Sequence, residues 1–215
     1  MIMRKQILSL IFLMLSLAAA AQVPTDAILS VEAPDVFTAV FTTPKGAFTI
    51  EFYREWSPRG ADRVFQLLQS GYYDNQCIFR VQKEYVVQFG IADNKEVNAY
   101  WDQRPIKDEP AKAPNRIWNV SFARDGADSR TTHLFINLKD NPKLDTITYN
   151  GATGSTPVGM VISGMEVLQA LNGDYGFEPT NHQDAAMKEG NAYWNRQFPG
   201  LDYIQTARVL EDASK

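Results

Sequence analysis

Alternation of apolar and polar residues marks the first regular part of the chain. Apolar side chains occupy every second position from Phe37 to Phe41, and the alternation resumes over residues 48–53, after the segment Pro44-Lys45-Gly46. Period-two alternation is typical of strands with one buried face, and a proline followed two residues later by glycine is typical of a turn. The pattern therefore predicts a β-hairpin over residues 36–53.

Helical spacing of apolar residues begins directly after this hairpin. Ser57 can cap a helix whose first turn contains Pro58, and the apolar stripe continues until Gly71. A second, shorter helix is predicted from Met165 to Leu171, and residues 184–189 form a weaker helical segment. We interpret the apolar stripes as faces that pack on a core.

A second hairpin is predicted over residues 77–89, and it contains two unexpected polar residues. Two short β-branched and aromatic runs flank a polar link at residues 82–84. Because side chains alternate between the faces of a strand, antiparallel pairing could bring Arg80 and Gln88 side by side over a groove. Considered alone, however, an arginine in a strand is more often a surface residue of an edge strand.

The remaining pattern consists of short strands and one long polar stretch. Residues 91–117 contain three prolines and no clean period, which favours a long loop, and terminal residues 201–210 can form a last strand. Further strands are predicted at residues 120–123, 134–136 and 157–161. Many strands with only two convincing helices predict a mainly β fold, a closed β-barrel capped by helices.

The first 21 residues have the features of a signal peptide. Arg4 and Lys5 precede an apolar run from Ile7 to Leu17, and small residues end the segment at Ala21. We expect cleavage after Ala21 and a periplasmic or secreted mature protein. The apolar run is too short for a lasting span, so we expect no stable membrane insertion. Residues 22–35 then form an irregular segment before a single domain over residues 36–210.

The net charge and the cysteine count limit the possible partners and the possible disulfide bonds. Removal of the leader takes away Arg4 and Lys5 but no acidic residue, so the formal net charge goes from −4 to −6. An acidic domain is a poor ligand for phosphate backbones, so we expect no nucleic-acid partner. Cys77 is the only cysteine, which excludes an intramolecular disulfide. We expect a monomer.

Several short motifs, taken in order, resemble the cyclophilin family of peptidyl-prolyl isomerases. The resemblance extends from Val36 to Leu171 and implies an eight-stranded antiparallel barrel with two capping helices and a proline-binding groove on its outside. Because of the leader, the chain resembles an exported, bacterial-like member. The motifs are Phe79-Arg80-Val81, Val87-Gln88-Phe89-Gly90, Ser121-Phe122-Ala123, the run Thr132 to Asn137 and the run Pro157 to Val161.

The resemblance also implies roles for individual residues. Arg80 matches the catalytic arginine, and Gln88 matches the glutamine that helps to hold the substrate backbone. Ala123 and Arg124 match the segment that binds substrate through backbone groups, while His133 lies at the groove edge. The apolar walls of the proline pocket are matched by Tyr85, Val86, Phe135 and Leu144.

Some positions depart from the family pattern. His133 stands where glutamine is common, Lys143 stands where many members have an aromatic residue, and Phe79 stands where the family often has histidine. These changes bear on substrate preference more than on the chemistry.

The implied reaction needs no cofactor and no metal. His133 and His182 are the only histidines, and neither has a metal-ligand partner at a suitable spacing. Two functions stay open. The first is an isomerase that acts on proline-containing polypeptides and accelerates the folding of exported proteins. The second is a non-catalytic proline-peptide-binding or chaperone-like module on the same fold.

Overall fold

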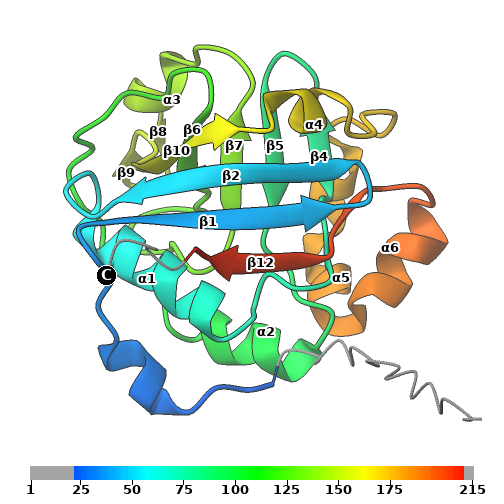
Figure 1. Cartoon of the computed structure of the whole chain (residues 1–215), viewed down its shortest axis with the longest axis horizontal. Helices are drawn as coiled ribbons and strands as arrows, with labels where there is room; N and C mark the ends of the chain where they lie inside the picture. The colour runs from blue at the N-terminus through cyan, green and yellow to red at the C-terminus, as the bar shows by residue number, and fades with distance from the viewer. Residues whose placement is uncertain (1–21, 211–215) are drawn as a thin grey trace, which may run out of the picture.

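One curled antiparallel sheet forms the body of the protein (Figure 1). The computed structural model describes residues 22–210, so the predicted signal peptide lies outside the described residues. Each strand of the sheet is antiparallel to its neighbours. From one edge to the other, the eight strands are β12 (Thr206–Val209), β1 (Val36–Thr43), β2 (Gly46–Tyr53), β10 (Pro157–Ser163), β6 (Asn119–Phe122), β7 (Leu134–Asn137), β5 (Val86–Phe89) and β4 (Arg80–Gln82).

The sheet does not close, so the predicted closed barrel is wrong. Its outer strands, β12 and β4, are not paired with each other, and the result is an open, strongly curled half-barrel. The segments just before them, β11 (Tyr203–Ile204) and β3 (Gln76–Cys77), pair in a separate two-stranded sheet. Backbone hydrogen bonds near the opening are therefore satisfied by this short ladder rather than by direct pairing of the two edges.

The first hairpin confirms the prediction for residues 36–53. Strands β1 and β2 pair continuously from Val36 opposite Tyr53 to Thr43 opposite Gly46. Gly46 has φ 128°, a backbone conformation that favours glycine, and a Cβ there would lie 2.9 Å from the Val167 side chain. The alternation therefore predicted both strands correctly, and the segment Pro44-Lys45-Gly46 predicted the turn.

More helices are present than the two convincing ones that were predicted. Those two are α1 (Pro58–Gln69) and α4 (Met165–Gln169), and the weaker predicted segment is α5 (Gln183–Glu189); α1 lies under the sheet while α5 lies at one side (Figure 1). The additional ones are α2 (Lys95–Asp102), α3 (Lys143–Thr146), α6 (Asn191–Gln197) and the 3-10 helices η1 (Asp26–Ser30) and η2 (Glu178–His182). Within residues 22–210, no helix combines the length and apolar character needed to cross a membrane.

Helix α2 lies inside the segment that was expected to be an irregular loop. The Asn94 side chain accepts hydrogen bonds from the amides of Glu96 and Val97, which caps the helix. Val97 and Trp101 are buried on its inner face. An eight-residue helix repeats its apolar positions too few times to give a clear period.

The N-terminus of α1 is capped differently from the prediction. The Ser57 side chain makes no capping hydrogen bond to the helix. Instead, Glu109 accepts a hydrogen bond from the Arg59 amide at 2.7 Å and another from the Ser57 hydroxyl at 2.5 Å. A carboxylate at this position also interacts favourably with the helix dipole.

Residues 22–35 lie against α1 rather than apart from the domain. The Gln66 side-chain amide donates to the Val31 carbonyl at 2.9 Å, and the Ala33 amide donates to Asp62 at the same distance. This segment therefore belongs to the folded body, although most of it has no regular structure apart from η1.

Most of the buried apolar residues between 22 and 210 belong to one of two clusters. The larger one fills the curl of the sheet and includes the facing Phe41 and Phe48, whose rings stack with centroids 5.2 Å apart. The smaller one joins β3 and the C-terminal helices, and in it Phe79 stacks on Trp194 with centroids 5.6 Å apart. This contact explains the departure at Phe79, because an aromatic ring there packs against α6.

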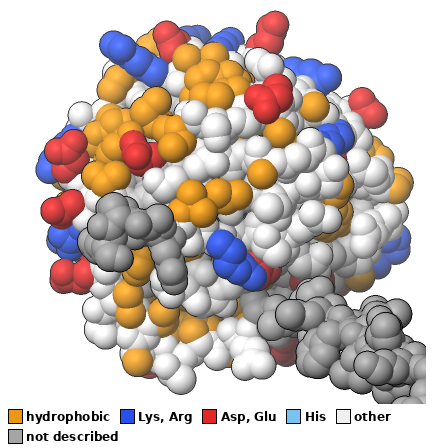
Figure 2. Space-filling view, in the orientation of Figure 1, with side chains coloured by type: hydrophobic (Ala, Val, Ile, Leu, Met, Phe, Trp, Pro, Cys, Tyr) orange, Lys and Arg blue, Asp and Glu red, His pale blue; other side chains and the backbone are white. Residues whose placement is uncertain are grey.

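Charged side chains of both signs are interspersed around the face that carries β1, β2 and β12 (Figure 2). Hydrophobic side chains on this face form separate groups among them. The expectation that this acidic chain does not bind nucleic acid stays a prediction.

Candidate active site

Arg80 and Gln88 lie side by side on neighbouring strands, as the alternation of the sequence predicted. Strands β4 and β5 place them directly opposite each other. Nη1 of Arg80 donates a hydrogen bond to Oε1 of Gln88 at 3.0 Å. Strand β4 is an edge strand, but Arg80 is only partly exposed. Its side chain is therefore held over the sheet rather than extended into solvent.

Gln82 is a second partner of Arg80, and it was expected only to be part of a turn. It lies two residues along β4, on the same face as Arg80. Its Oε1 accepts a hydrogen bond from Arg80 Nε at 2.7 Å and another from Nη2. A guanidinium has five N–H donors, and three are used by Gln82 and Gln88. Two donors are thus left for a ligand.

Two aromatic rings flank the guanidinium. Its carbon lies 5.4 Å from the ring centroid of Tyr85 and 5.0 Å from that of Phe177. Burial lowers the pKa of Arg80, and the neighbouring Tyr85 opposes that shift. Phe177 lies beyond the stretch that carries the family resemblance, and no periodic pattern in the sequence marked it.

A small pocket opens beside Arg80 and gathers nearly all of the predicted site residues. Its volume is about 150 Å³, below the roughly 300–1,000 Å³ of pockets for drug-sized ligands, so it suits a single side chain. Of the predicted residues only His133 is missing from its lining, and Ser155 is an addition. The lining residues are Arg80, Tyr85, Val86, Gln88, Ala123, Arg124, Phe135, Leu144 and Ser155.

The pocket floor comes from the sheet and its outer wall from helix α3. Val86 on β5 and Phe135 on β7 are buried, and the pairing of β5 with β7 sets Phe135 opposite Gln88. Leu144 lies on α3, and its carbonyl accepts a hydrogen bond from the Ser155 amide at 2.7 Å. An apolar floor with a polar pair at its edge is the result.

The Arg124 side chain is bound within the protein, so its charge is already neutralised by a neighbouring residue. Its Nη1 forms an ion pair with Asp108 at 3.1 Å, and its Nη2 donates to the Gly154 carbonyl. The small hairpin of β8 (Thr148–Tyr149) and β9 (Ala152–Thr153) adjoins this contact. With the side chain tied in this way, the backbone is the part of Arg124 that can meet a substrate.

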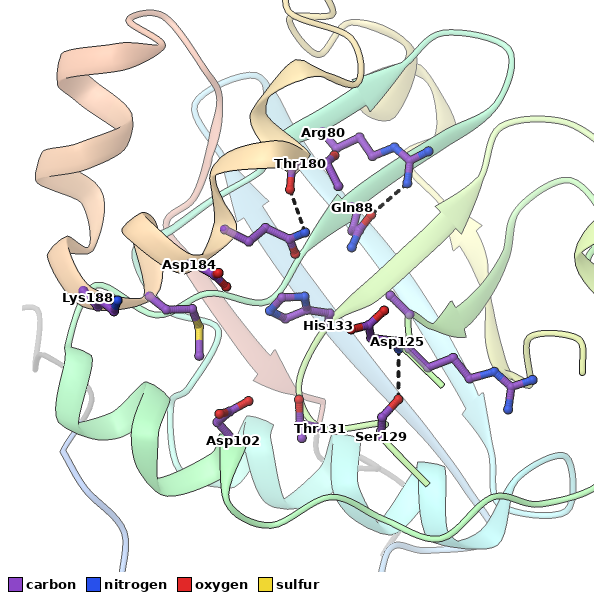
Figure 3. Close-up of a pocket in the computed structure, with 14 residues that line it drawn as sticks. Arg80, Gln88, Asp102, Asp125, Ser129, Thr131, His133, Thr180, Asp184 and Lys188 are labelled. Atoms are coloured by element: carbon purple, nitrogen blue, oxygen red, sulfur yellow. Dashed lines mark hydrogen bonds between the residues drawn. The ribbon is translucent and has the colours of Figure 1, made fainter. Parts of the chain in front are cut away.

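His133 lines a second, larger pocket of about 660 Å³ that also contains Arg80 and Gln88 (Figure 3). Its ring points into this pocket, with Asp102 and Thr131 at the opposite end from Arg80. Burial lowers the pKa of His133 to about 4, and the contact with Gln183 opposes that shift. The imidazole is therefore neutral at neutral pH.

The C-terminal segment supplies a wall of this larger pocket that the sequence had not indicated. Residues of η2 and α5 face His133 across it, namely Thr180, Gln183, Asp184, Met187 and Lys188. Among residues 22–210, no group of three or more histidine, cysteine or acidic side chains is arranged to hold a metal ion.

Comparison with known families decides the identity of the fold. The profile described as cyclophilin type peptidyl-prolyl cis-trans isomerase/CLD matches residues 38–190. The chain belongs to this family. Its members are isomerases, so the expected enzyme class is confirmed at the level of the family.

Curated cyclophilins from eukaryotes are similar to the chain over most of their length. A peptidyl-prolyl cis-trans isomerase-like 1 of Aspergillus fumigatus is 29% identical over 154 residues, which cover 70% of this chain and 88% of the relative. The peptidyl-prolyl cis-trans isomerase cypE of Dictyostelium discoideum is 27% identical over 139 residues, or 63% of this chain and 84% of the relative. These eukaryotic relatives give no support for an exported, bacterial-like cyclophilin, which stays a prediction.

Solved cyclophilin structures share the fold. A cyclophilin type peptidyl-prolyl cis-trans isomerase of Cryptosporidium parvum has a TM-score of 0.59 at 16% identity, and the match covers 82% of this chain and 99% of that chain. The same protein in the presence of the dipeptide Ala-Pro has a TM-score of 0.57 at 15% identity, with coverage of 81% and 99%. At this identity the similarity establishes the fold alone.

Proposed function

We propose that this cyclophilin catalyses the cis–trans rotation of X-Pro bonds in polypeptides, with Arg80 as the catalytic residue. One observation carries the proposal. Arg80 lies at the edge of an apolar pocket of single-side-chain size, is fixed by Gln82 and Gln88, and keeps two N–H donors for a ligand.

The chemistry of the peptide bond explains why a fixed donor accelerates this reaction. Resonance gives the C–N bond partial double-bond character and a rotation barrier of about 18–20 kcal/mol. As the bond twists, the prolyl nitrogen becomes pyramidal and can accept a hydrogen bond that the planar ground state cannot accept. A donor held at that position stabilises the transition state selectively. Arginine suits this role because it stays charged and its donors form a rigid fork.

The other pocket residues hold the substrate while the bond rotates. Tyr85, Val86, Phe135 and Leu144 surround the pyrrolidine ring and exclude water from it. Oε1 of Gln88 is occupied by Arg80, so its amide group donates to the substrate backbone.

The segment after β6 contributes backbone groups. The Ala123 amide already donates to the His133 carbonyl at 2.9 Å, so the groups that Ala123 and Arg124 offer to a substrate are the Ala123 carbonyl and the Arg124 amide.

Activity measurements on the purified domain test this proposal. Wild type should accelerate isomerisation of a short Ala-Pro peptide in a protease-coupled or NMR exchange assay. Arg80→Ala should lose about 10²- to 10³-fold in kcat/KM, the range seen when one preorganised donor is removed. Arg80→Lys should recover only part of the loss, because lysine lacks the planar fork.

Equal rates for wild type and Arg80→Ala, both at the uncatalysed level, would reject the enzyme. Binding of the same peptide by both proteins would then support the non-catalytic peptide-binding module.

We also propose that the substrates are exported polypeptides, in the periplasm or outside the cell. The support is the sequence pattern of residues 1–21. Mass spectrometry of the protein isolated from a periplasmic fraction or the medium should find an N-terminus at Gln22. Recovery of protein that begins at Met1 from the cytoplasm alone would contradict export.

A further inference from the structure

Phe177 is a large apolar side chain in an exposed position next to the catalytic arginine. It is 46% exposed and belongs to neither buried apolar cluster. The guanidinium carbon of Arg80 lies over its ring, 5.0 Å from the centroid. Core packing therefore does not account for a phenylalanine at this position, whereas the contact with Arg80 does.

The backbone just before Phe177 packs against the body of the protein at two points. Tyr175 packs edge-on against Phe198, with centroids 5.2 Å apart, and its hydroxyl donates to the Pro199 carbonyl at 2.9 Å. Gly173 lies close to β4, where a Cβ would come within 3.2 Å of the Val81 carbonyl. The Phe177 ring is thus presented to Arg80 by a segment that is fixed to β4 and to the C-terminal cluster.

The contacts of Arg80 restrain it in complementary directions. Hydrogen bonds to Gln82 and Gln88 lie in the guanidinium plane, because the N–H groups of arginine lie in that plane. They resist rotation within the plane but give little resistance to tilting out of it. The Phe177 ring, 5.0 Å from the guanidinium carbon, provides that second restraint through cation–π attraction, together with the Tyr85 ring at 5.4 Å.

We propose that Phe177 is a positioning residue that holds the Arg80 guanidinium in the orientation required for donation to the prolyl nitrogen. Phe177 is not part of the lining of the proline pocket, so its effect is exerted through Arg80. This inference rests on the proposed isomerase function and adds to it a residue from the C-terminal segment.

Four variants separate this role from simple packing. Phe177→Ala should lower kcat about three- to tenfold, the range expected from loss of a partly exposed cation–π contact, with KM nearly unchanged. Phe177→Trp should keep the wild-type kcat, because it retains an aromatic ring. Phe177→Leu should have a kcat as low as that of Phe177→Ala, because it keeps apolar bulk without a π face. Ile162→Ala removes another exposed apolar side chain, from β10, and should leave the rate unchanged.

Unchanged kcat in Phe177→Ala would overturn the proposal, and so would a fully active Phe177→Leu. A rise in KM alone would also overturn it, since that result would place the ring against the substrate.

A spectroscopic measurement keeps the inference testable independently of activity. The ring current of Phe177 should shift the Nε–H resonance of Arg80, which can be assigned by its loss in Arg80→Lys. Phe177→Ala should move this resonance and speed its exchange with solvent, while Ile162→Ala should leave it in place. An unmoved resonance would reject the contact even if wild type proved inactive, whereas an inactive wild type with a moved resonance would reject only the proposed function.

Discussion

Hydrogen bonds from two glutamines set the orientation of Arg80 at the level of single residues. Gln88 comes from the neighbouring strand and Gln82 from the same strand, and both accept through their side-chain oxygen. Hydrogen bonds to charged groups contribute about 1.5–3 kcal/mol each, more than neutral ones. Gln82 should therefore influence catalysis although it does not line the proline pocket.

Replacement of Gln82 tests this influence. Gln82→Leu keeps most of the side-chain volume but removes the acceptor, so we expect kcat to fall about tenfold because Arg80 samples other orientations. The same isomerisation assay measures the effect. Lys83→Ala, at the exposed next residue, is the matched control. An equal loss in both variants would show that the turn, and not the hydrogen bond, matters.

The neutral state of His133 makes the stability of the protein depend on pH. Its folded-state pKa of about 4 lies below the ordinary value of 6.5. Between these values the unfolded chain binds more protons than the folded one, so the free energy of unfolding should fall as the pH is lowered from 6.5 towards 4. Urea unfolding at a series of pH values measures this, and His133→Gln should have a shallower dependence. Identical slopes would contradict the assignment to His133.

At the level of elements, Glu109 joins three parts of the chain around the start of α1. It accepts hydrogen bonds at the N-terminus of the helix and pairs with Arg130 at 3.1 Å. The Arg130 side chain is fully buried. A loop residue thus caps α1 and neutralises a buried cation at the same time.

Loss of Glu109 should be costly. Glu109→Ala removes the closer of the two carboxylates that pair with the buried Arg130 and leaves only Asp108, at 3.5 Å. Breaking a buried pair by removal of one partner typically destabilises a protein by about 3–5 kcal/mol. Replacing both partners, as in Glu109→Leu with Arg130→Met, should cost less, because no unpaired charge is left. Urea unfolding gives both values. Lys107→Ala, which breaks the exposed ion pair with Asp128, should cost no more than about 1 kcal/mol. An effect of Glu109→Ala as small as that of Lys107→Ala would reject this role.

The elements that could be predicted from the sequence are those with enough repeats of their period. Eight-residue alternation defined β1 and β2, and short alternating runs were sufficient to set Arg80 opposite Gln88. Helix α2 has only Val97 and Trp101 as its buried apolar residues, which is too little for a helical period. Phe177 and the pocket residues of η2 and α5 reach the site only because segments distant in the sequence pack together. A local sequence pattern does not indicate such packing.

At the scale of the whole molecule, the C-terminal helices are part of the domain rather than an appendage. They contact the sheet region through the stack of Trp194 on α6 against Phe79, the residue before Arg80. Trp194 is fully buried. The closed barrel was predicted wrongly because the opening of the sheet depends on long-range pairing. Strands β3 and β11, which pair near the opening, are more than 100 residues apart in the sequence.

A double-mutant cycle measures this contact. Trp194→Ala should destabilise the protein by about 3–5 kcal/mol, and Phe79→Leu by less. The two changes should be coupled by about 0.5–1.5 kcal/mol, the usual value for a stacked aromatic pair. Tyr149→Ala, at an exposed aromatic residue, should have little effect on the free energy of unfolding. Strict additivity of the first two changes would show that the stack contributes nothing beyond burial.

Strand β1 lies between its neighbour in sequence, β2, and a strand from the other end of the domain, β12. Thr42 thus stands opposite Thr206, and their hydroxyls are 2.6 Å apart. During synthesis the β1–β2 hairpin is complete long before β12 exists, so one side of β1 is left open to pairing with other chains. Pairing over such a separation is also slow. A protein proposed to hasten the folding of others is therefore limited, in its own folding, by the arrival of its last strand.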